Sequence, residues 1–378
     1  MSDDSDKPLD DFIERFSEEP GYLDFARRGP VGRTVRDEES AMSSLLGRSR
    51  FGTLGTLDEQ DARVRAAVAR LTGFRADQVV YQPNTSQGLM HAMFGLTGEI
   101  LLSPSEFPSN TYAVSRATDA LGVVTPRWLE TDHGRVTPGN IKRQLRKSTV
   151  AVQVSLVDYR TGYLVDLEGI RQVIGDRLLI VDAIQGFGVV DAPYALADVV
   201  VSGGQKWVRA GWGTGFLALS DRAVETLVPV FSGFNATDAD GMPTEVLPPK
   251  RGAGAFSISN PDPIAQARFA AALEEIAEVG VPAINARLAE KTSRIIDLAD
   301  EFALEVTSSR DESERAGIVV VTPDTDQLTL LTASLHNHGV TSTAREGAVR
   351  LSPHVTTDEE TFAMLRGAFT SFGSAINL

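Results

Sequence analysis

Two stretches decide the fold: RLLIVDAIQGFGVV, residues 177–190, and DVVVSGGQKWVRAGWGTGFLAL, residues 198–219. The apolar runs 178–181 and 198–201 do not alternate with polar residues and are rich in β-branched side chains, which predicts buried parallel strands. Each run ends in a polar residue followed by small ones. In an open α/β sheet, ligands bind outside the carboxyl ends of the strands. The two stretches therefore predict a ligand site at this edge of an α/β sheet.

The first strand brings Asp182 and Gln185 to this edge, and the second brings Lys206 between SGGQ and a glycine-rich turn. The chain has 6 lysines against 30 arginines, so an arginine would have served as a surface charge. A Schiff base needs an amine that can lose its proton, which a guanidinium does not. A carboxylate on the neighbouring strand suits the pyridinium nitrogen of pyridoxal phosphate. The same residues also fit a surface lysine beside a turn and an aspartate that caps a strand, and alone they leave both interpretations open.

The order VDAIQGFG, then Lys206 24 residues after Asp182 in QKWVRAGWGTGFLAL, resembles the class V aminotransferase family of pyridoxal-phosphate enzymes. Cysteine desulfurases, kynureninase and isopenicillin N epimerase are members of that family. The similarity runs from Tyr22 to about Phe362. It implies an α/β protein of fold type I, with a mostly parallel sheet flanked by helices. It also implies a tail over residues 1–20, a large cofactor-binding domain over 21–280 and a small α+β domain over 281–378.

The resemblance assigns roles residue by residue. Lys206 would hold the cofactor and move protons at Cα, Asp182 would face the pyridine nitrogen, and Arg350, in VRLSPH, would bind the substrate carboxylate. These three are the candidate catalytic residues. The candidate cofactor-binding residues are Thr85, Ser86, Phe107, Ser155, Asp182, Gln185, Gln205, Lys206 and Asn260.

Further positions follow from the same resemblance. Asp158 and Thr161 fall where related enzymes line the pocket, and Arg345 is a weaker candidate for substrate binding. Asn260 occupies the position from which, in relatives, the neighbouring subunit reaches the cofactor phosphate. A homodimer with shared active sites is therefore expected.

The sequence departs from the family pattern at two places. Relatives usually carry Ser or Thr, any residue, and His before the lysine, where this chain has Gly203-Gly204-Gln205. Leu89 stands where kynureninases have a histidine against the substrate ring, which argues against kynureninase itself. The favoured reaction is aminotransferase-like chemistry on a small amino acid. A kynureninase-like hydrolase, a cysteine-independent desulfurase or C–S lyase, an epimerase and a catalytically degenerate binding module remain alternatives.

Composition narrows the choices further. The net charge of −15 argues against nucleic acid or an anionic membrane as a partner. The chain has no cysteine, which excludes disulfides, thiolate metal sites and a persulfide relay through a cysteine of its own. No metal site is indicated. The acidic start MSDDSDKPLDD lacks a signal peptide, so a cytoplasmic enzyme is expected, with about ten disordered residues at the N-terminus.

Periodicity predicts the remaining elements. Apolar residues at helical spacing predict helices over 58–71, 261–276, 282–302 and 326–336, and a further helix begins at the Asn84-Thr85-Ser86 cluster. Short apolar runs predict strands over 78–81 and 99–103 and, near the C-terminus, over 317–323 and 347–354. The segment 231–250 is rich in Gly, Pro and Asp without periodicity, so it is expected to be a loop, with pocket residues on it.

Overall fold

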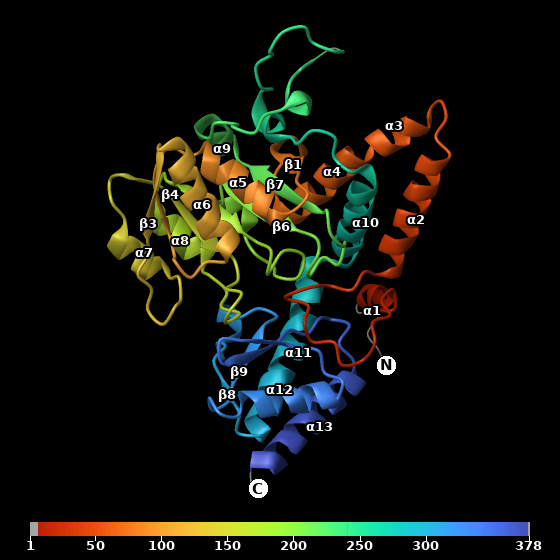
Figure 1. Ribbon diagram of the computed structural model, residues 1–378, viewed down its shortest axis with the longest axis vertical. Helices are drawn as coiled ribbons and strands as arrows, with labels where there is room; N and C mark the ends of the chain where they lie inside the picture. The colour runs from red at the N-terminus through yellow and green to blue at the C-terminus, as the bar shows by residue number, and fades with distance from the viewer. Residues whose placement is uncertain (1–6, 240, 377–378) are drawn as a thin grey trace.

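The computed structural model describes residues 7–239 and 241–376 and contains two β-sheets with helices packed around them (Figure 1). The larger sheet has the strand order β1-β7-β6-β5-β4-β2-β3. Its strands are β1 (Val79–Tyr81), β2 (Gly98–Leu102), β3 (Val124–Trp128), β4 (Thr149–Ser155), β5 (Leu178–Asp182), β6 (Val199–Gly203) and β7 (Gly215–Leu219). The expected α/β sheet, including both strands of the opening stretches, is confirmed.

All neighbouring pairs in the larger sheet are parallel except those that β7 makes with β6 and β1. The register pairs Ser155 with Asp182 and Asp182 with Val201, so β4, β5 and β6 end side by side. The polar residues that follow these strands are thereby brought to one edge of the sheet, as the sequence predicted.

Both faces of the larger sheet are buried, which explains why its central strands do not alternate in polarity. Along β5, Leu179 and Val181 pack into one hydrophobic core, and Leu178 and Ile180 pack into a second core on the opposite face. The helices around the sheet are α2 (Arg33–Gly47), α3 (Thr53–Asp58), α4 (Gln60–Thr72), α5 (Thr85–Gly95), α6 (Pro108–Leu121), α7 (Pro138–Gln144), α8 (Leu167–Ile174), α9 (Asp221–Thr226) and α10 (Pro263–Val279).

A smaller antiparallel sheet with the order β10-β11-β9-β8 follows in the chain. Its strands are β8 (Glu305–Val306), β9 (Val319–Thr322), β10 (Thr343–Arg345) and β11 (Ala348–Leu351). The long helix α11 (Val281–Glu301) leads into this sheet, and α12 (Leu328–Asn337) and α13 (Glu359–Ile376) pack beside each other at the far end of the molecule (Figure 1). The division at residue 280 into two domains stays a prediction.

The segment 21–31 ties the two sheets together. Tyr22 and Asp24 form parallel bridges with Thr341 and Ser352 beside the smaller sheet. Further along, the backbone N–H of Gly29 donates to the carbonyl of Gln205, at 2.9 Å, beside the larger sheet. The chain therefore crosses from one sheet to the other next to Lys206.

Arg209 fixes the same crossing from the opposite side. Its guanidinium donates to the Pro30 carbonyl and to Thr356 Oγ1, pairs with Glu18, and lies 3.6 Å above the ring of Phe16. One buried cation thus joins the N-terminal segment, the loop after β6 and the segment after β11.

The expected disorder at the N-terminus is wrong for residues 7–10. They belong to helix α1 (Lys7–Ile13), because Leu9 and Phe12 give that helix an apolar side that packs into the first hydrophobic core. Residues 1–6 lie outside the described part of the chain.

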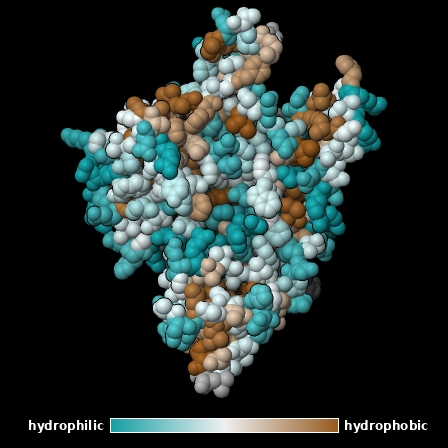
Figure 2. Space-filling model, viewed as in Figure 1, coloured by the Kyte–Doolittle hydropathy of each residue, from teal (hydrophilic) through white to brown (hydrophobic). Residues whose placement is uncertain are grey.

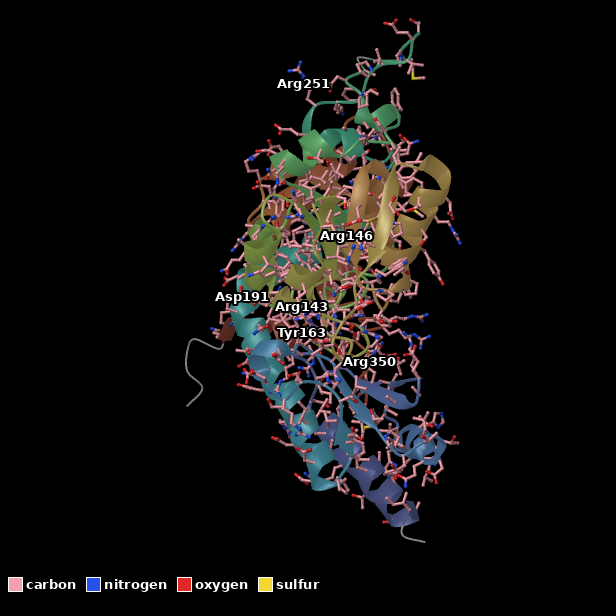
Figure 3. The ribbon with its side chains drawn as sticks, turned by 90° about the vertical axis from the view of Figure 1, so that its left-hand side faces the viewer. Arg143, Arg146, Tyr163, Asp191, Arg251 and Arg350 are labelled. Carbon is pink, nitrogen blue, oxygen red and sulfur yellow. The ribbon has the colours of Figure 1, made fainter. Side chains whose placement is uncertain are left out.

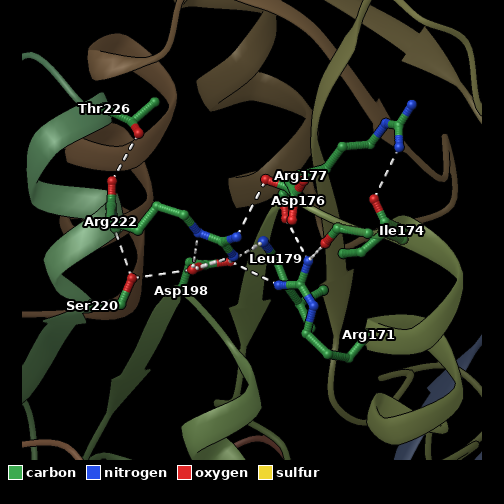
Figure 4. Close-up of polar contacts among 11 residues, drawn as sticks. Arg171, Ile174, Asp176, Arg177, Leu179, Asp198, Ser220, Arg222 and Thr226 are labelled. Carbon is green, nitrogen blue, oxygen red and sulfur yellow. Dashed lines mark hydrogen bonds and ion pairs between the residues drawn. The ribbon is translucent and has the colours of Figure 1, made fainter.

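At the edge of the larger sheet where β5 and β6 begin, an ion-pair cluster surrounds Asp198 (Figure 4). Asp198 directly precedes β6. The Asp198 carboxylate accepts hydrogen bonds from Arg171, Arg222, Ser220 and the backbone N–H of Leu179. This carboxylate therefore links β6 to β5, α8 and α9.

The segment 231–250 is a loop, as predicted, apart from a short 3₁₀ turn at Phe234–Ala236. It projects from the end of the molecule opposite α12 and α13, away from the smaller sheet (Figure 1). Whether it carries pocket residues, which depends on the fold and on contacts with a partner subunit, stays a prediction. Among the described helices, none combines the length and the apolarity required to cross a bilayer.

Candidate active site

The candidate site lies where the loops after β2, β4, β5 and β6 meet the N-terminus of α5. Helix α5 starts there because Asn84 caps it, accepting from the backbone N–H of Gln87 at 3.0 Å. Gly88 in α5 faces Val201 in β6, and a Cβ on this glycine would lie 2.4 Å from Val201 Cγ1. This close packing places the first turn of α5 against the end of β6.

Lys206 lies on the loop after β6, with its amine 5.6 Å from the centre of the Phe107 ring. Burial removes water from the amine and lowers its pKa from 10.5 to about 8. The charge of Asp182 opposes this shift, and the nearby Arg350 and Arg345 add to it. A lysine with this pKa has a substantial neutral fraction near physiological pH, which both a nucleophile and a general base require.

Asp182 is fully buried at the end of β5. Its carboxylate accepts hydrogen bonds from Asn110 Nδ2 at 3.0 Å and from the backbone N–H of Ile184 at 3.1 Å. Burial raises the pKa of Asp182, and these two donors and Lys206 act against that rise. Sequence analysis missed Asn110, since only the three-dimensional approach of α6 to β5 shows that this amide supports the carboxylate.

Phe107 directly precedes α6, and its ring is flanked by Lys206 and by Tyr159, whose ring meets it edge-on with centroids 5.2 Å apart. Phe107 and Lys206, both predicted cofactor-binding residues, are therefore adjacent. Tyr159 was not predicted, because a tyrosine in the polar turn 158–162 carries no signal of its own.

Thr85, Gly203 and Gln205 surround a small polar space. Thr85 Oγ1 is buried and has no hydrogen-bond partner among the described residues. A Cβ on Gly203 would lie 3.1 Å from that hydroxyl and 2.4 Å from Gln205 Oε1, so the backbone of this glycine lies close to both polar groups. An unpaired buried hydroxyl and free N–H groups at a helix N-terminus suit a phosphate group. Ser86 differs from Thr85, because its hydroxyl already shares a 2.7 Å hydrogen bond with Ser109.

Two of the predicted cofactor-binding residues are engaged with protein groups. Gln185 donates to the Ala26 carbonyl at 3.0 Å and accepts from Trp207 Nε1 at 2.9 Å. One N–H of its amide remains for another partner. The hydroxyl of Ser155 donates to Glu106, which also accepts from the Ser155 backbone N–H at 3.0 Å.

Glu106 is a buried carboxyl group that sequence analysis missed, although it directly precedes Phe107. Burial raises its pKa to about 7, and the charge of Asp182 adds to this rise, while the two hydrogen bonds from Ser155 lower it. The candidate site therefore contains two buried carboxyl groups whose charges act on each other.

Arg350 lies on β11, where the two sheets meet (Figure 3). One of its terminal nitrogens donates to the Tyr159 carbonyl at 3.0 Å, and the other lies 3.5 Å from a carboxylate oxygen of Asp24. Its Nε is buried without a partner among the described residues. The guanidinium is held on two sides, and its Nε–H has no acceptor among the described residues.

Asn260 is not part of this cluster within one chain. It is exposed, has φ of 50°, and lines a separate hollow of about 690 Å³ between α3 and the segment that leads into α10. The structure therefore brings together Thr85, Phe107, Ser155, Asp182, Gln185, Gln205, Lys206 and Arg350, and leaves Asn260 apart.

Comparison with known proteins identifies the family. A family model for aminotransferase class V matches residues 35–371. The chain belongs to the class V aminotransferase family. It is a pyridoxal-phosphate-dependent enzyme of this family. A kynureninase from Salinispora tropica is 26% identical over 371 residues, with 89% of this chain and 86% of the relative covered.

Solved structures support the same fold. A cysteine desulfurase from Thermococcus onnurineus superimposes with a TM-score of 0.82 at 19% identity, covering 92% of this chain and 93% of that protein. A cystine C–S lyase in complex with its product cysteine persulfide gives a TM-score of 0.82 at 19% identity, covering 93% and 97%. The predicted fold type I architecture is confirmed.

The residues present fit the cofactor. A buried carboxylate, an aromatic ring, an amine with a lowered pKa and an open polar space with an unpaired hydroxyl lie around one point. These are the groups that the pyridine nitrogen, the ring face, the aldehyde carbon and the phosphate of pyridoxal phosphate require.

Proposed function

We propose that this enzyme binds pyridoxal phosphate through Lys206 and acts on the α-amino group and Cα of a small amino acid, with aminotransferase-like chemistry. The observation that carries the proposal is the position of the Lys206 amine, 5.6 Å from the centre of the Phe107 ring and under the influence of the Asp182 charge, where burial lowers its pKa to about 8. The bound cofactor supplies an electron sink for the bond broken at Cα.

The residues around the cofactor have separate tasks in this proposal. Asp182 stabilises a proton on the pyridine nitrogen, because two hydrogen bonds hold the carboxylate in place. Phe107 packs on the ring face, and Thr85 with Gln205 binds the phosphate in the space that Gly203 leaves open. Ser86, Ser155 and Gln185 act mainly through Ser109, Glu106 and Trp207, to which they are hydrogen-bonded.

Arg350 binds the substrate, and Lys206 deprotonates it. Arg350 binds the α-carboxylate through its free donor, which fixes the direction of the bonds around Cα. Lys206, once released, takes the proton from Cα and returns it at another atom, which its lowered pKa favours.

We infer that the active enzyme is a homodimer in which Asn260 of one subunit completes the phosphate site of the other. Large apolar side chains are exposed near the hollow that Asn260 lines, on α3 and on the loop 231–250, and hydrophobic atoms gather near α3 on the face in Figure 2. Leu54 on α3 lines the hollow itself, and Phe51, two residues before α3, and Val246 on the loop are also exposed. Sedimentation analysis tests this inference, and a monomer that retains full cofactor affinity contradicts it. A cytoplasmic location stays a prediction that cell fractionation tests.

A kynureninase-like hydrolase is the second candidate, favoured by the Salinispora relative and by the sequence Phe107-Pro108-Ser109. Leu89 opposes it, because this side chain is fully buried in a hydrophobic core rather than available to a substrate ring. Product analysis separates the candidates. Alanine and an aromatic acid from kynurenine indicate the hydrolase, a keto acid indicates transamination, and sulfide or an inverted amino acid indicates a C–S lyase or an epimerase.

The visible absorption spectrum of the purified protein tests the proposed function. We expect a violet-region band from the covalently attached cofactor that is absent in Lys206→Ala and retained in the control Lys147→Ala, which changes an exposed lysine. Amino acids of the right class shift or bleach the band. A protein that shows no band after addition of pyridoxal phosphate would be a degenerate binding module.

A further inference from the structure

A cavity of about 220 Å³ lies between the two sheets, next to the candidate active site. Tyr159, whose ring touches Phe107, and Arg350 form part of its wall. Arg160, Arg345 and Glu346 lie on the remaining wall together with small residues of β9, β10 and β11. One water needs about 10–15 Å³ of such space, so the cavity has room for a substrate side chain of several atoms.

Charged side chains of both signs line the cavity. Three arginines face one glutamate, and two of the arginines are paired with carboxylates outside the cavity wall. Arg160 pairs with Asp158 at 2.7 Å, and Arg350 lies 3.5 Å from Asp24. Arg345 has no carboxylate within ion-pair distance in the described part of the chain, and its guanidinium lies 5.7 Å from the centre of the Tyr159 ring. Glu346 likewise has no cation within ion-pair distance among the described residues, so the cavity contains one unpaired charge of each sign, Arg345 and Glu346.

The strand register places Arg345 on the same face as Arg350. Thr343 in β10 pairs directly with Arg350 in β11, and Arg345 is two residues beyond Thr343. Residues two apart share one face of a strand, and diagonal neighbours across two strands are about 7–8 Å apart. Both charges also act on Lys206, since each lowers its pKa. The two guanidinium groups are thus arranged side by side at the entrance to the site.

We propose that the substrate is a dicarboxylic amino acid of four or five carbons, with its α-carboxylate on Arg350 and its side-chain carboxylate on Arg345. This inference rests on the proposed function, because it names the substrate class of the same site. Glu346 opposes an anion in the cavity, whereas Arg345 shares one face of the strand pair with Arg350, which favours a ligand that carries two carboxylates. A neutral side chain would leave Arg345 without a partner.

Binding of simple acids tests the proposal without any turnover. Succinate and glutarate, which lack the amino group, are compared with butyrate by isothermal titration of the wild-type protein. We expect succinate or glutarate to bind at least tenfold more tightly than butyrate. Arg345→Gln should weaken dicarboxylate binding about 10- to 100-fold, the usual contribution of a charged hydrogen bond, and leave butyrate unchanged. Arg116→Gln, which changes an exposed arginine on α6, is the matched control.

The outcomes distinguish this proposal from the proposed function. Equal affinity for succinate and butyrate, or an Arg345→Gln variant with unchanged dicarboxylate affinity, overturns the substrate class, whatever the absorption spectrum shows. A missing cofactor band overturns the proposed function alone. When the band is present, aspartate or glutamate should shift it at lower concentration than asparagine or glutamine, and Arg345→Gln should remove that preference.

Discussion

Replacing Lys206 by methionine should stabilise the cofactor-free protein at neutral pH. In the folded chain, burial lowers the pKa of Lys206 from 10.5 to about 8, so the charged form costs free energy below pH 8. Each pKa unit corresponds to 1.36 kcal/mol, and this shift therefore costs about 3 kcal/mol. The cost already includes the attraction of Asp182. Methionine has a similar length and carries no charge, so Lys206→Met removes the cost.

The size of this effect falls to zero over a defined pH window. A lysine whose folded pKa lies below its unfolded value destabilises the fold below the folded pKa, and the penalty disappears as the pH rises from about 8 to 10.5. Lys206→Met should therefore be more stable than the wild type by about 3 kcal/mol at pH 6–7, and the two should converge above pH 10.

Urea unfolding of the cofactor-free proteins at pH 6, 7, 9 and 10 measures the difference. Lys147→Met changes an exposed lysine and should alter the free energy of unfolding by no more than about 0.5 kcal/mol at every pH. A Lys206→Met variant that is less stable than the wild type at pH 7, or a difference that does not depend on pH, would refute the reasoning.

Three further changes test other parts of the structure. Asp198→Ala leaves two arginines without their shared partner and should cost about 3 kcal/mol in urea unfolding, whereas the exposed Asp119→Ala should cost less than about 0.5 kcal/mol. Thr85→Val should weaken pyridoxal-phosphate affinity about tenfold or more in a fluorescence titration, and an unchanged affinity would exclude the hydroxyl from phosphate binding. Because the folded pKa of Glu106 is about 7, above its unfolded value, the stability it contributes at low pH is lost as the pH rises from about 4.5 to 7. Glu106→Gln should flatten this part of the stability curve, and a curve that keeps the wild-type slope would contradict the raised pKa.

The sequence was sufficient for the strands β1, β2, β5 and β6 of the larger sheet and for the polar residues where β5 and β6 end. Buried parallel strands appear in a sequence as apolar runs, so the ends of β5 and β6 were predicted to within two residues of their observed positions. The position of the polar residues that follow these strands was then predicted from the geometry of a parallel sheet. The register that puts Ser155 beside Asp182 then brings these residues together.

The partners of these residues could not be predicted in the same way. Asn110, which donates a hydrogen bond to Asp182, is 72 residues away from it in the sequence. Asp24, which lies beside Arg350, is separated from it by most of the chain. Such contacts depend on how α6 and the N-terminal segment pack, and no local pattern encodes them. Helix α1 was missed for a related reason, since its apolar side makes sense only against the core that it covers.

The crossing segment 21–31 has a consequence for how the protein is made. Asp24 leaves the ribosome 328 residues before its bridge partner Ser352. Synthesis proceeds at about 5–20 residues per second, so Asp24 waits roughly 15–65 s for its partner. The strand ends around Lys206 assemble well before Arg350 exists. The cofactor-binding half of the site is therefore synthesised first, and the substrate-binding half is completed only when Arg350 and Ser352 reach the much earlier segment that contains Asp24.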